Sequence, residues 1–356
     1  MCANKKTFKG DYYSVNSILG NDWAIFYILC GGRSTGKSYD VMRWGIQRKV
    51  KLGDNLKWYW FRLTDNATKN LLAGGADKLV DPDLKRKYNL NLMTKNTTVY
   101  SYDKVTKTKK DGTQYESKVN KKEFLEVLSC STFYNTKGVG YFDNEFKGEY
   151  LLVLDEMNRE QSEKNSFDIV YNFVNLIENL VRETHTKIKV IMIGNTLDEA
   201  SDILAAFNFI PDDLGRFKLK SKKCVIDNIR PNEAYLKRRK ESIANILLPN
   251  ASTFTNEISI DRSLLVNKRS VTRPDLIIKF SKDQNDWFTL CNSKIVRDYK
   301  VSDEGHRVIT MRKYLDDIYS EEKVKWVFEM FNARFLNYTS LACFKKFQKQ
   351  LKLLKK

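Results

Sequence analysis

One glycine-rich octapeptide constrains the fold of this chain more than any other feature of its sequence. Residues 31–38 read Gly-Gly-Arg-Ser-Thr-Gly-Lys-Ser and match G-x-x-x-x-G-K-[S/T], the phosphate-binding P-loop pattern. The apolar run at residues 23–30 predicts a buried strand before the loop, and a helical pattern follows it. This order points backbone N–H groups and the positive end of a helix dipole at a phosphate. The sequence therefore predicts an α/β fold that binds a nucleotide.

Each residue type in this loop has a distinct chemical role. Gly31 and Gly36 let the backbone turn tightly without a Cβ clash. Lys37 is expected to reach the β- and γ-phosphates, and the Ser38 hydroxyl to ligate Mg²⁺. The predicted nucleotide-binding residues are Gly31, Gly32, Arg33, Ser34, Thr35, Gly36, Lys37 and Ser38.

A second motif predicts the acidic half of the same site. The hydrophobic segment 151–154 ends in Asp155 and Glu156, as a Walker B strand does. Asp155 is expected to hold Mg²⁺ together with Ser38. Glu156 is then placed to activate a water for attack on the γ-phosphate.

A third strand, predicted at residues 189–193, also ends in polar residues. In ATPases with an additional strand between the two Walker strands, such a residue lies close to the γ-phosphate, so Asn195 is a catalytic candidate; an ordinary strand-end turn is the alternative. Residues 195–198 half resemble the N-K-x-D of GTPases, but their lysine is missing, and residues 155–158 lack the D-x-x-G glycine. The predicted cofactors are therefore ATP and Mg²⁺ rather than GTP.

Phosphoryl transfer also needs positive charge at the transition state, often from an arginine. Arg182 ends an amphipathic helix predicted at residues 166–183 and ranks first, as a finger that acts in a neighbouring subunit. Arg33 inside the P-loop is a candidate in cis, and Arg159 follows the Walker B box. Arg62, at the end of a predicted strand, is a candidate for coupling the nucleotide state to movement of the protein.

The net charge of +18 is distributed unevenly along the chain. Residues 213–356 carry 31 Lys/Arg and 17 Asp/Glu, whereas residues 1–212 carry 31 and 27. A basic surface of this size favours a nucleic-acid partner, although solubility alone is an alternative. No apolar run approaches the length of a membrane span, and no signal peptide is visible. The six scattered cysteines argue against a zinc site or a disulfide framework and fit a cytosolic protein.

The chain divides into regions of different character. Residues 1–212 alternate apolar strands with helices and predict a P-loop ATPase domain with a mainly parallel sheet flanked by helices. Its predicted strands are at residues 23–29, 57–63, 124–129, 150–154 and 189–193. A polar insertion at 91–120 predicts either a β-hairpin with a basic tip or a disordered lysine loop. Residues 213–250 predict a basic helical linker, and 251–356 a smaller α+β domain that binds nucleic acid.

These residues resemble those of the DNA-packaging ATPases of small, phi29-like tailed phages. Arg33 in the third loop position, the Asp155-Glu156 box, the strand end at Asn195 and the helix that ends in Arg182 carry the resemblance. The K-G-x-G segment at 137–140 is similar to one in the larger terminases. The resemblance covers residues 20–212, and beyond them only the layout is similar.

The resemblance implies an ATPase of the additional-strand, catalytic-glutamate class. It also implies a C-terminal domain similar to an RNase H-type nuclease that has lost its catalytic acids. Strand 276–281 carries no internal carboxylate, which agrees with that loss. In the family, the motor is a homopentameric ring at the portal vertex of the procapsid, with a structural packaging RNA as scaffold. These implications place the protein in the host cytoplasm and transiently at that vertex, with no membrane partner.

The resulting hypothesis is an ATP-driven motor that moves double-stranded viral DNA into a capsid. A P-loop helicase and a morphogenesis ATPase with a protein substrate are alternative enzymes. A nucleotide-gated scaffold that binds RNA is an alternative of another class.

Overall fold

The computed structural model describes residues 8–9, 12–111, 113–132, 145–158, 167–181, 187–195, 201–211, 213–247, 264–266, 274–280, 287–298, 307–310 and 321–354. The chain forms two compact units. Met1–Leu197 and Asp213–Ile258 make up the first, and Asp198–Asp212 and Ser259–Lys356 the second. None of the described helices combines the length and apolar character that crossing a bilayer requires.

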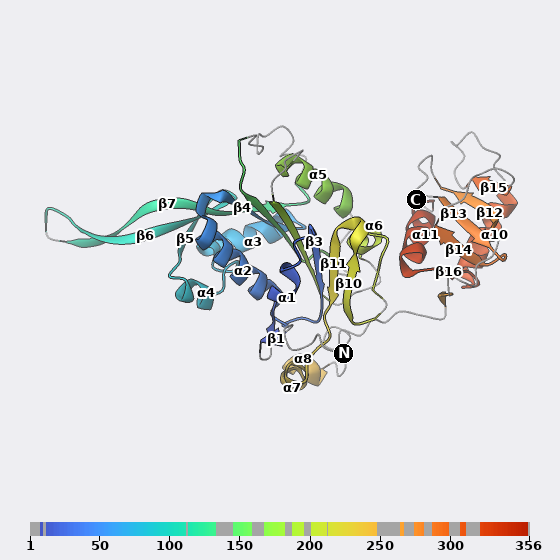
Figure 1. Cartoon of the computed structure of the whole chain (residues 1–356), viewed down its shortest axis with the longest axis horizontal. Helices are drawn as coiled ribbons and strands as arrows, with labels where there is room; N and C mark the ends of the chain where they lie inside the picture. The colour runs from blue at the N-terminus through green and yellow to red at the C-terminus, as the bar shows by residue number, and fades with distance from the viewer. Residues whose placement is uncertain are drawn as a thin grey trace. The chain divides into compact units, whose positions relative to one another are not determined.

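A nine-stranded sheet organises the first unit (Figure 1), in the order β10-β11-β3-β9-β8-β4-β7-β6-β5. The strands from β11 to β7 run parallel, and β10, β6 and β5 pair antiparallel at the edges. The strands are β3 (Phe26–Cys30), β4 (Leu56–Arg62), β5 (Asn91–Lys95), β6 (Thr98–Thr108), β7 (Gln114–Ser129), β8 (Glu149–Asp155), β9 (Lys187–Gly194), β10 (Gly215–Leu219) and β11 (Cys224–Asn228).

All five strands predicted for this region are present, as β3, β4, β7, β8 and β9. The apolar runs become central strands because they are buried on both faces, as parallel sheets require. Strand β9 lies between β3, which precedes the P-loop, and β8, which precedes Asp155. This order confirms the predicted fold with an additional strand between the two Walker strands.

Helices flank this sheet (Figure 1). The longest, α2, begins at Lys37 directly after the glycine loop. Helix α5 lies within the range predicted at 166–183 and buries one apolar side, made of Ile169, Phe173, Leu176, Leu180 and Val181, whereas Val174 is half exposed. The helices of the first unit are α1 (Asn16–Leu19), α2 (Lys37–Leu52), α3 (Asp65–Ala76), α4 (Pro82–Lys87), α5 (Ile169–Val181), α7 (Glu233–Lys240) and α8 (Ile243–Leu247). A short ribbon of β1 (Phe8–Lys9) and β2 (Tyr12–Tyr13) precedes them.

The polar insertion at residues 91–120 forms an antiparallel ribbon, which decides between the two predicted alternatives. Strand β6 pairs with both β5 and β7, and the β6–β7 ladder extends to the pair Thr108 and Gln114. The hairpin prediction is therefore confirmed for the described residues of this segment.

The prediction of a linker at residues 213–250 is wrong for its first part. Strand β11 is buried along its whole length and pairs in parallel with β3, next to the P-loop strand. Strand β10 pairs with its outer side as the edge strand, where the exposed basic residues Arg216 and Lys218 disfavour further pairing. The basic residues of this edge strand gave the segment the composition of a linker. Within residues 213–247, the α-helices are α7 and α8, which agrees with the helical part of the prediction.

The second unit has a five-stranded sheet in the order β15-β12-β13-β14-β16. Its aromatic core includes Phe280, Phe288 and Phe347, whose rings contact one another edge to face. The elements are α6 (Asp202–Ala206), β12 (Pro274–Lys279), β13 (Trp287–Cys291), β14 (Ile295–Asp298), β15 (Arg307–Thr310), α10 (Glu321–Asn332), β16 (Asn337–Tyr338) and α11 (Leu341–Leu354). The strand predicted at 276–281 overlaps β12, and the likeness to an RNase H-type nuclease stays a prediction.

Candidate nucleotide site

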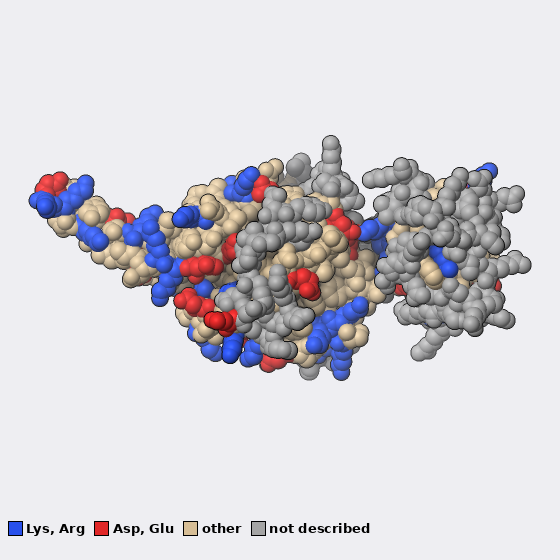
Figure 2. All heavy atoms as spheres, turned by 90° about the horizontal axis from the view of Figure 1, so that it is seen from above, with Lys and Arg blue, Asp and Glu red and all other residues tan. Residues whose placement is uncertain are grey.

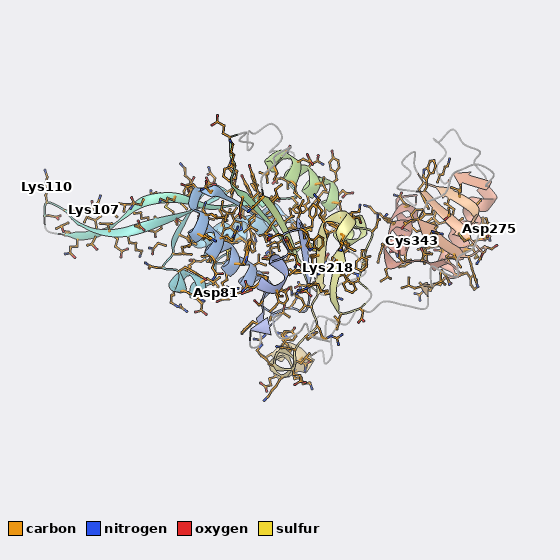
Figure 3. All side chains as sticks on the ribbon, viewed as in Figure 1. Asp81, Lys107, Lys110, Lys218, Asp275 and Cys343 are labelled. Carbon is orange, nitrogen blue, oxygen red and sulfur yellow. The ribbon has the colours of Figure 1, made fainter. Side chains whose placement is uncertain are left out.

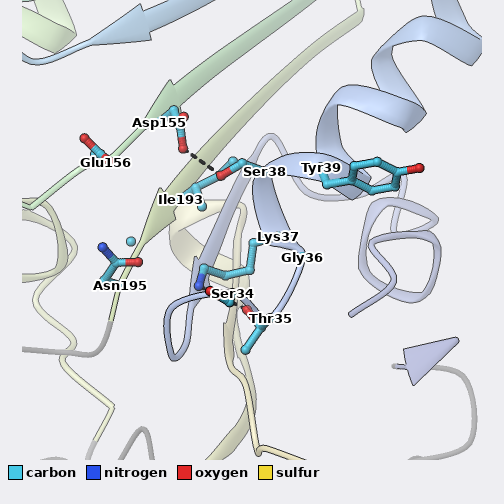
Figure 4. A pocket seen from close by; sticks show the side chains of 11 residues that line it. Ser34, Thr35, Gly36, Lys37, Ser38, Tyr39, Asp155, Glu156, Ile193 and Asn195 are labelled. Atoms are coloured by element: carbon cyan, nitrogen blue, oxygen red, sulfur yellow. Dashed lines mark hydrogen bonds between the residues drawn. The ribbon is translucent and has the colours of Figure 1, made fainter. Parts of the chain in front are cut away.

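A cleft of about 220 Å³ lies where β3, β8 and β9 end (Figure 4). The carboxyl ends of parallel strands meet at one edge of a sheet, so residues far apart in sequence converge there. The cleft is lined by Ser34, Thr35, Gly36, Lys37, Ser38, Tyr39, Asp155, Glu156, Ile193, Gly194 and Asn195. Three separately predicted motifs thus line one cleft.

The glycine loop reaches the helix through a backbone conformation that favours glycine. Gly36 precedes α2 with φ of 90°, in the left-handed region. A Cβ on this residue would lie 3.1 Å from the Tyr12 ring. Lys37 and Ser38 then form the first turn of the 16-residue helix, so the free N–H groups of that turn border the cleft.

The Lys37 ammonium is buried and folded back onto the loop that precedes it. Its Nζ donates to the carbonyl oxygens of Gly31 at 2.8 Å and Gly32 at 2.9 Å, and to Thr35 Oγ1 at 3.2 Å. Burial lowers the pKa of Lys37 to about 8, although nearby Cys30 and Asp155 raise it in part. A buried cation beside few opposite charges is well suited to an anionic ligand such as a phosphate.

The lowered pKa predicts a pH dependence of stability. Between the folded value of about 8 and the ordinary 10.5, the unfolded chain binds more protons than the folded protein. The free energy of unfolding therefore rises with pH across this window. From pH 7.5 to pH 9.5, we expect the wild type to gain about 2 kcal/mol relative to Lys37→Met. Urea unfolding of both proteins at each pH measures this gain, and parallel pH profiles would contradict it.

Ser38 and Asp155 bring two hard oxygen atoms together at the cleft. The Ser38 Oγ donates to Asp155 Oδ1 at 2.9 Å (Figure 4). Mg²⁺ is typically bound by one or two such protein oxygens together with phosphate oxygens and waters. This donor pair fits the predicted metal, with Ser38 and Asp155 as its protein ligands.

Glu156 is held by an arginine from the neighbouring strand. Arg62, the last residue of β4, forms an ion pair with Glu156 and places its Nη1 3.1 Å from Asp155 Oδ2. Glu156 also has φ of 61°, a conformation that costs energy for a residue with a side chain. Its side chain is 57% exposed, which leaves it accessible to water. To act as a base, Glu156 must release Arg62.

Of the remaining catalytic candidates, Asn195 and Arg33 lie within the described residues and two arginines do not. Asn195 directly follows β9, and its side chain lines the cleft together with Glu156 (Figure 4). Arg33 lies in the loop, where its carbonyl accepts a hydrogen bond from another element. Arg182 and Arg159 lie outside the described residues, as does the segment at 137–140.

Two side chains of helix α7 form hydrogen bonds to the P-loop backbone, a feature that the sequence did not predict. The Tyr235 hydroxyl donates to the Arg33 carbonyl at 2.8 Å, and Arg238 Nη2 donates to the Ser34 carbonyl at 2.9 Å. The Arg238 guanidinium also lies 4.4 Å from the centre of the Tyr12 ring. These contacts fix two peptide groups of the loop. From the sequence, the cluster Lys-Arg-Arg-Lys at 237–240 indicated only that this helix is basic, not that it contacts the P-loop.

Removing one of these contacts should weaken nucleotide binding. Tyr235→Phe loses the hydrogen bond to the Arg33 carbonyl, and the loop becomes less ordered before it binds phosphate. Because such a bond contributes about 0.5–1.5 kcal/mol, we expect the Kd for ATP to rise roughly 2- to 10-fold. Titration with a fluorescent ATP analogue measures the change. Tyr171→Phe, at an exposed tyrosine of α5, is the control, and equal affinities of the two variants would contradict the role.

Comparisons with known proteins agree with this architecture. No protein-family model and no curated protein matches the sequence. Among solved structures, the Phi-28 gp11 DNA packaging motor is similar over 98% of this chain and 99% of its own, with 15% identity and a TM-score of 0.62. The motor of the bacteriophage Phi-29 viral genome packaging assembly is similar over 97% and 100%, with 17% identity and a TM-score of 0.62. The chain therefore has the fold of phi29-type packaging motors over nearly its whole length, and the resemblance predicted from the sequence is confirmed at the level of the fold.

Proposed function

We propose that the protein is a Mg²⁺-dependent ATPase that drives double-stranded viral DNA into a preformed capsid. The observation that carries this proposal is the convergence of Lys37, Ser38, Asp155 and Glu156 at one cleft. A phosphate-binding cation, a pair of metal ligands and a water-activating carboxylate are the parts that P-loop hydrolases use. The two similar solved structures are DNA packaging motors, which favours DNA as the substrate that is moved.

The residues of the cleft divide the chemical work. When ATP binds, the hydrogen bonds from Lys37 Nζ to the loop carbonyls are replaced by hydrogen bonds to the β- and γ-phosphate oxygens, whose negative charge the ammonium offsets. Ser38 and Asp155 would hold Mg²⁺, which would supply positive charge beside the phosphates. Glu156 accepts the proton of the attacking water once it leaves Arg62, and Asn195 orients that water.

The finer assembly follows from the resemblance and is part of the proposal. The active form is a homo-oligomeric ring, a pentamer in the proposal, in which Arg182 of one subunit completes the site of the next. The ring acts at the portal vertex of the procapsid with a structural packaging RNA, in the host cytoplasm. Its grip on DNA is mainly to phosphates, because a motor must move any sequence.

ATP turnover with and without blunt duplex DNA tests the function. We expect duplex DNA to stimulate turnover, and empty procapsids with the portal to raise it further. Preference for single strands with duplex unwinding would indicate a helicase instead. Stimulation by a capsid protein but not by DNA would indicate a morphogenesis ATPase. Packaging that survives Glu156→Gln would indicate a nucleotide-gated scaffold.

A further inference from the structure

The β6–β7 hairpin extends from the first unit as a free two-stranded arm (Figure 1). We call residues 103–122 of this hairpin the arm. Every described residue of the arm is exposed except Ser117 and Val119, which are half-buried. The large buried side chains of the hairpin, such as Val99 and Phe124, all lie at its base. An isolated two-stranded ribbon is only marginally stable in water, so this arm is suited to a partner that covers it.

The arm is basic, and its acidic groups are already engaged. It carries seven lysines and three acidic residues. Asp103 accepts a hydrogen bond from Asn120 at 2.9 Å, and Asp111 accepts one from the Thr113 N–H. Glu116 pairs with Lys104 at 3.1 Å. Figure 2 shows basic side chains along the arm, and Figure 3 shows Lys107 and Lys110 at its far end.

Lysines lie on both faces of the ribbon. Residues directly opposite in an antiparallel ladder share a face, so Lys104 and Lys118 lie on one face. Lys107 pairs with Tyr115 and therefore lies on the other. Like charges directly opposite each other are destabilising, and although Glu116 pairs with Lys104, an anion beside Lys118 would lower that cost further.

This distribution favours nucleic acid over a protein as the partner. The large hydrophobic side chains exposed on the arm are Val105 and Tyr115, at 41% and 43%, too few for an apolar docking face. Because lysines lie on both faces of the ribbon, a suitable partner presents anionic groups to both faces. A nucleic-acid groove, which has a phosphate backbone on each side, meets this requirement. The major groove of B-form DNA is about 12 Å wide and admits a two-stranded ribbon, whereas that of A-form RNA is too narrow.

We propose that the arm inserts into the major groove of duplex DNA, with lysines from its two faces contacting the phosphates of both strands. The arm extends for about 9 residues per strand, or roughly 30 Å, which is close to one turn of the double helix. Its contacts are to phosphates and carry no sequence information. The proposal rests on the proposed motor function only in that the motor handles duplex DNA.

The test measures DNA affinity against salt, without nucleotide. The probe is a fluorescent 30-base-pair DNA duplex, titrated by anisotropy at several salt concentrations. For Lys107→Gln/Lys109→Gln/Lys110→Gln, we expect the negative slope of log K against log salt to become shallower by roughly 2 to 3, because each phosphate contact contributes about 0.9 to its magnitude. Affinity near 0.1 M salt should fall roughly 100-fold. Replacing residues 103–120 by Asn-Gly, a type I′ turn, should reduce both further.

Two controls make the result specific. Lys69→Gln/Lys78→Gln/Lys87→Gln changes the net charge equally at exposed lysines outside the arm, and its slope and affinity should stay near those of the wild type. An RNA duplex of the same sequence should bind the wild type and the arm variants alike.

Unchanged DNA affinity and slope in the arm variants would overturn the proposal, as would a loss confined to RNA. ATP turnover without DNA should be unaffected by the arm variants. A protein that binds duplex DNA through the arm but never hydrolyses ATP would contradict the proposed function and leave the arm proposal intact.

Discussion

Replacing Glu156 with glutamine should lower the maximal rate of ATP hydrolysis by roughly 10²- to 10⁴-fold, the usual contribution of a positioned general base. Glutamine keeps the size of the side chain but cannot accept the proton of the attacking water. Affinity for ATP should change little, because Lys37 and the loop backbone, not Glu156, bind the phosphates. Single-turnover hydrolysis and equilibrium binding, measured separately, distinguish the two effects.

The matched control is Glu178→Gln, an exposed carboxylate on α5. It should hydrolyse ATP at the rate of the wild type. If Glu156→Gln also stays within about threefold of the wild type, far below the 10²-fold expected of a general base, Glu156 is not the base. The chemistry assigned to this cleft would then be wrong.

Loss of the proposed arginine finger should have an effect at least as large. Arg182→Ala should lower turnover in the assembled ring by roughly 10³- to 10⁵-fold, as in other phosphoryl-transfer enzymes that use a trans arginine. The described part of α5 ends at Val181, the residue before Arg182.

Mixed rings test whether the finger acts in trans. Subunits with Arg182→Ala have an intact Glu156, and subunits with Glu156→Gln have an intact Arg182. Mixing the two inactive variants should restore part of the turnover, because some interfaces then combine both intact residues. Inactivity of mixed rings, with each variant shown to assemble, would contradict the trans assignment.

The fold of the first unit could be predicted because strong local signals coincide with the tertiary arrangement. The apolar strands at β3, β8 and β9 end in the functional residues, and parallel strands place their carboxyl ends together. The convergence of Lys37, Asp155 and Asn195 follows from that arrangement alone. The additional strand β9 between β3 and β8 also agrees with the predicted class.

Other features depend on long-range contacts that leave no local pattern. The sequence did not reveal the buried strand β11 because basic residues at 216–223 precede it, and its pairing partner β3 is about 200 residues away in the sequence. The hydrogen bonds from Tyr235 and Arg238 to the P-loop are equally remote. Sequence could locate Arg62 at a strand end, but its ion pair with Glu156 follows only from the adjacency of β4 and β8.

A structure of the protein with Mg²⁺ and a γ-phosphate analogue such as ADP–beryllium fluoride would show whether Lys37, Ser38 and Asp155 bind one nucleotide. We expect Lys37 Nζ within about 2.7–3.2 Å of the terminal phosphate mimic. We expect the metal about 2.0–2.1 Å from an oxygen of Ser38, with Asp155 in its shell. A nucleotide bound away from Lys37, or a metal remote from Ser38 and Asp155, would show that this cleft is not the site of ATP hydrolysis.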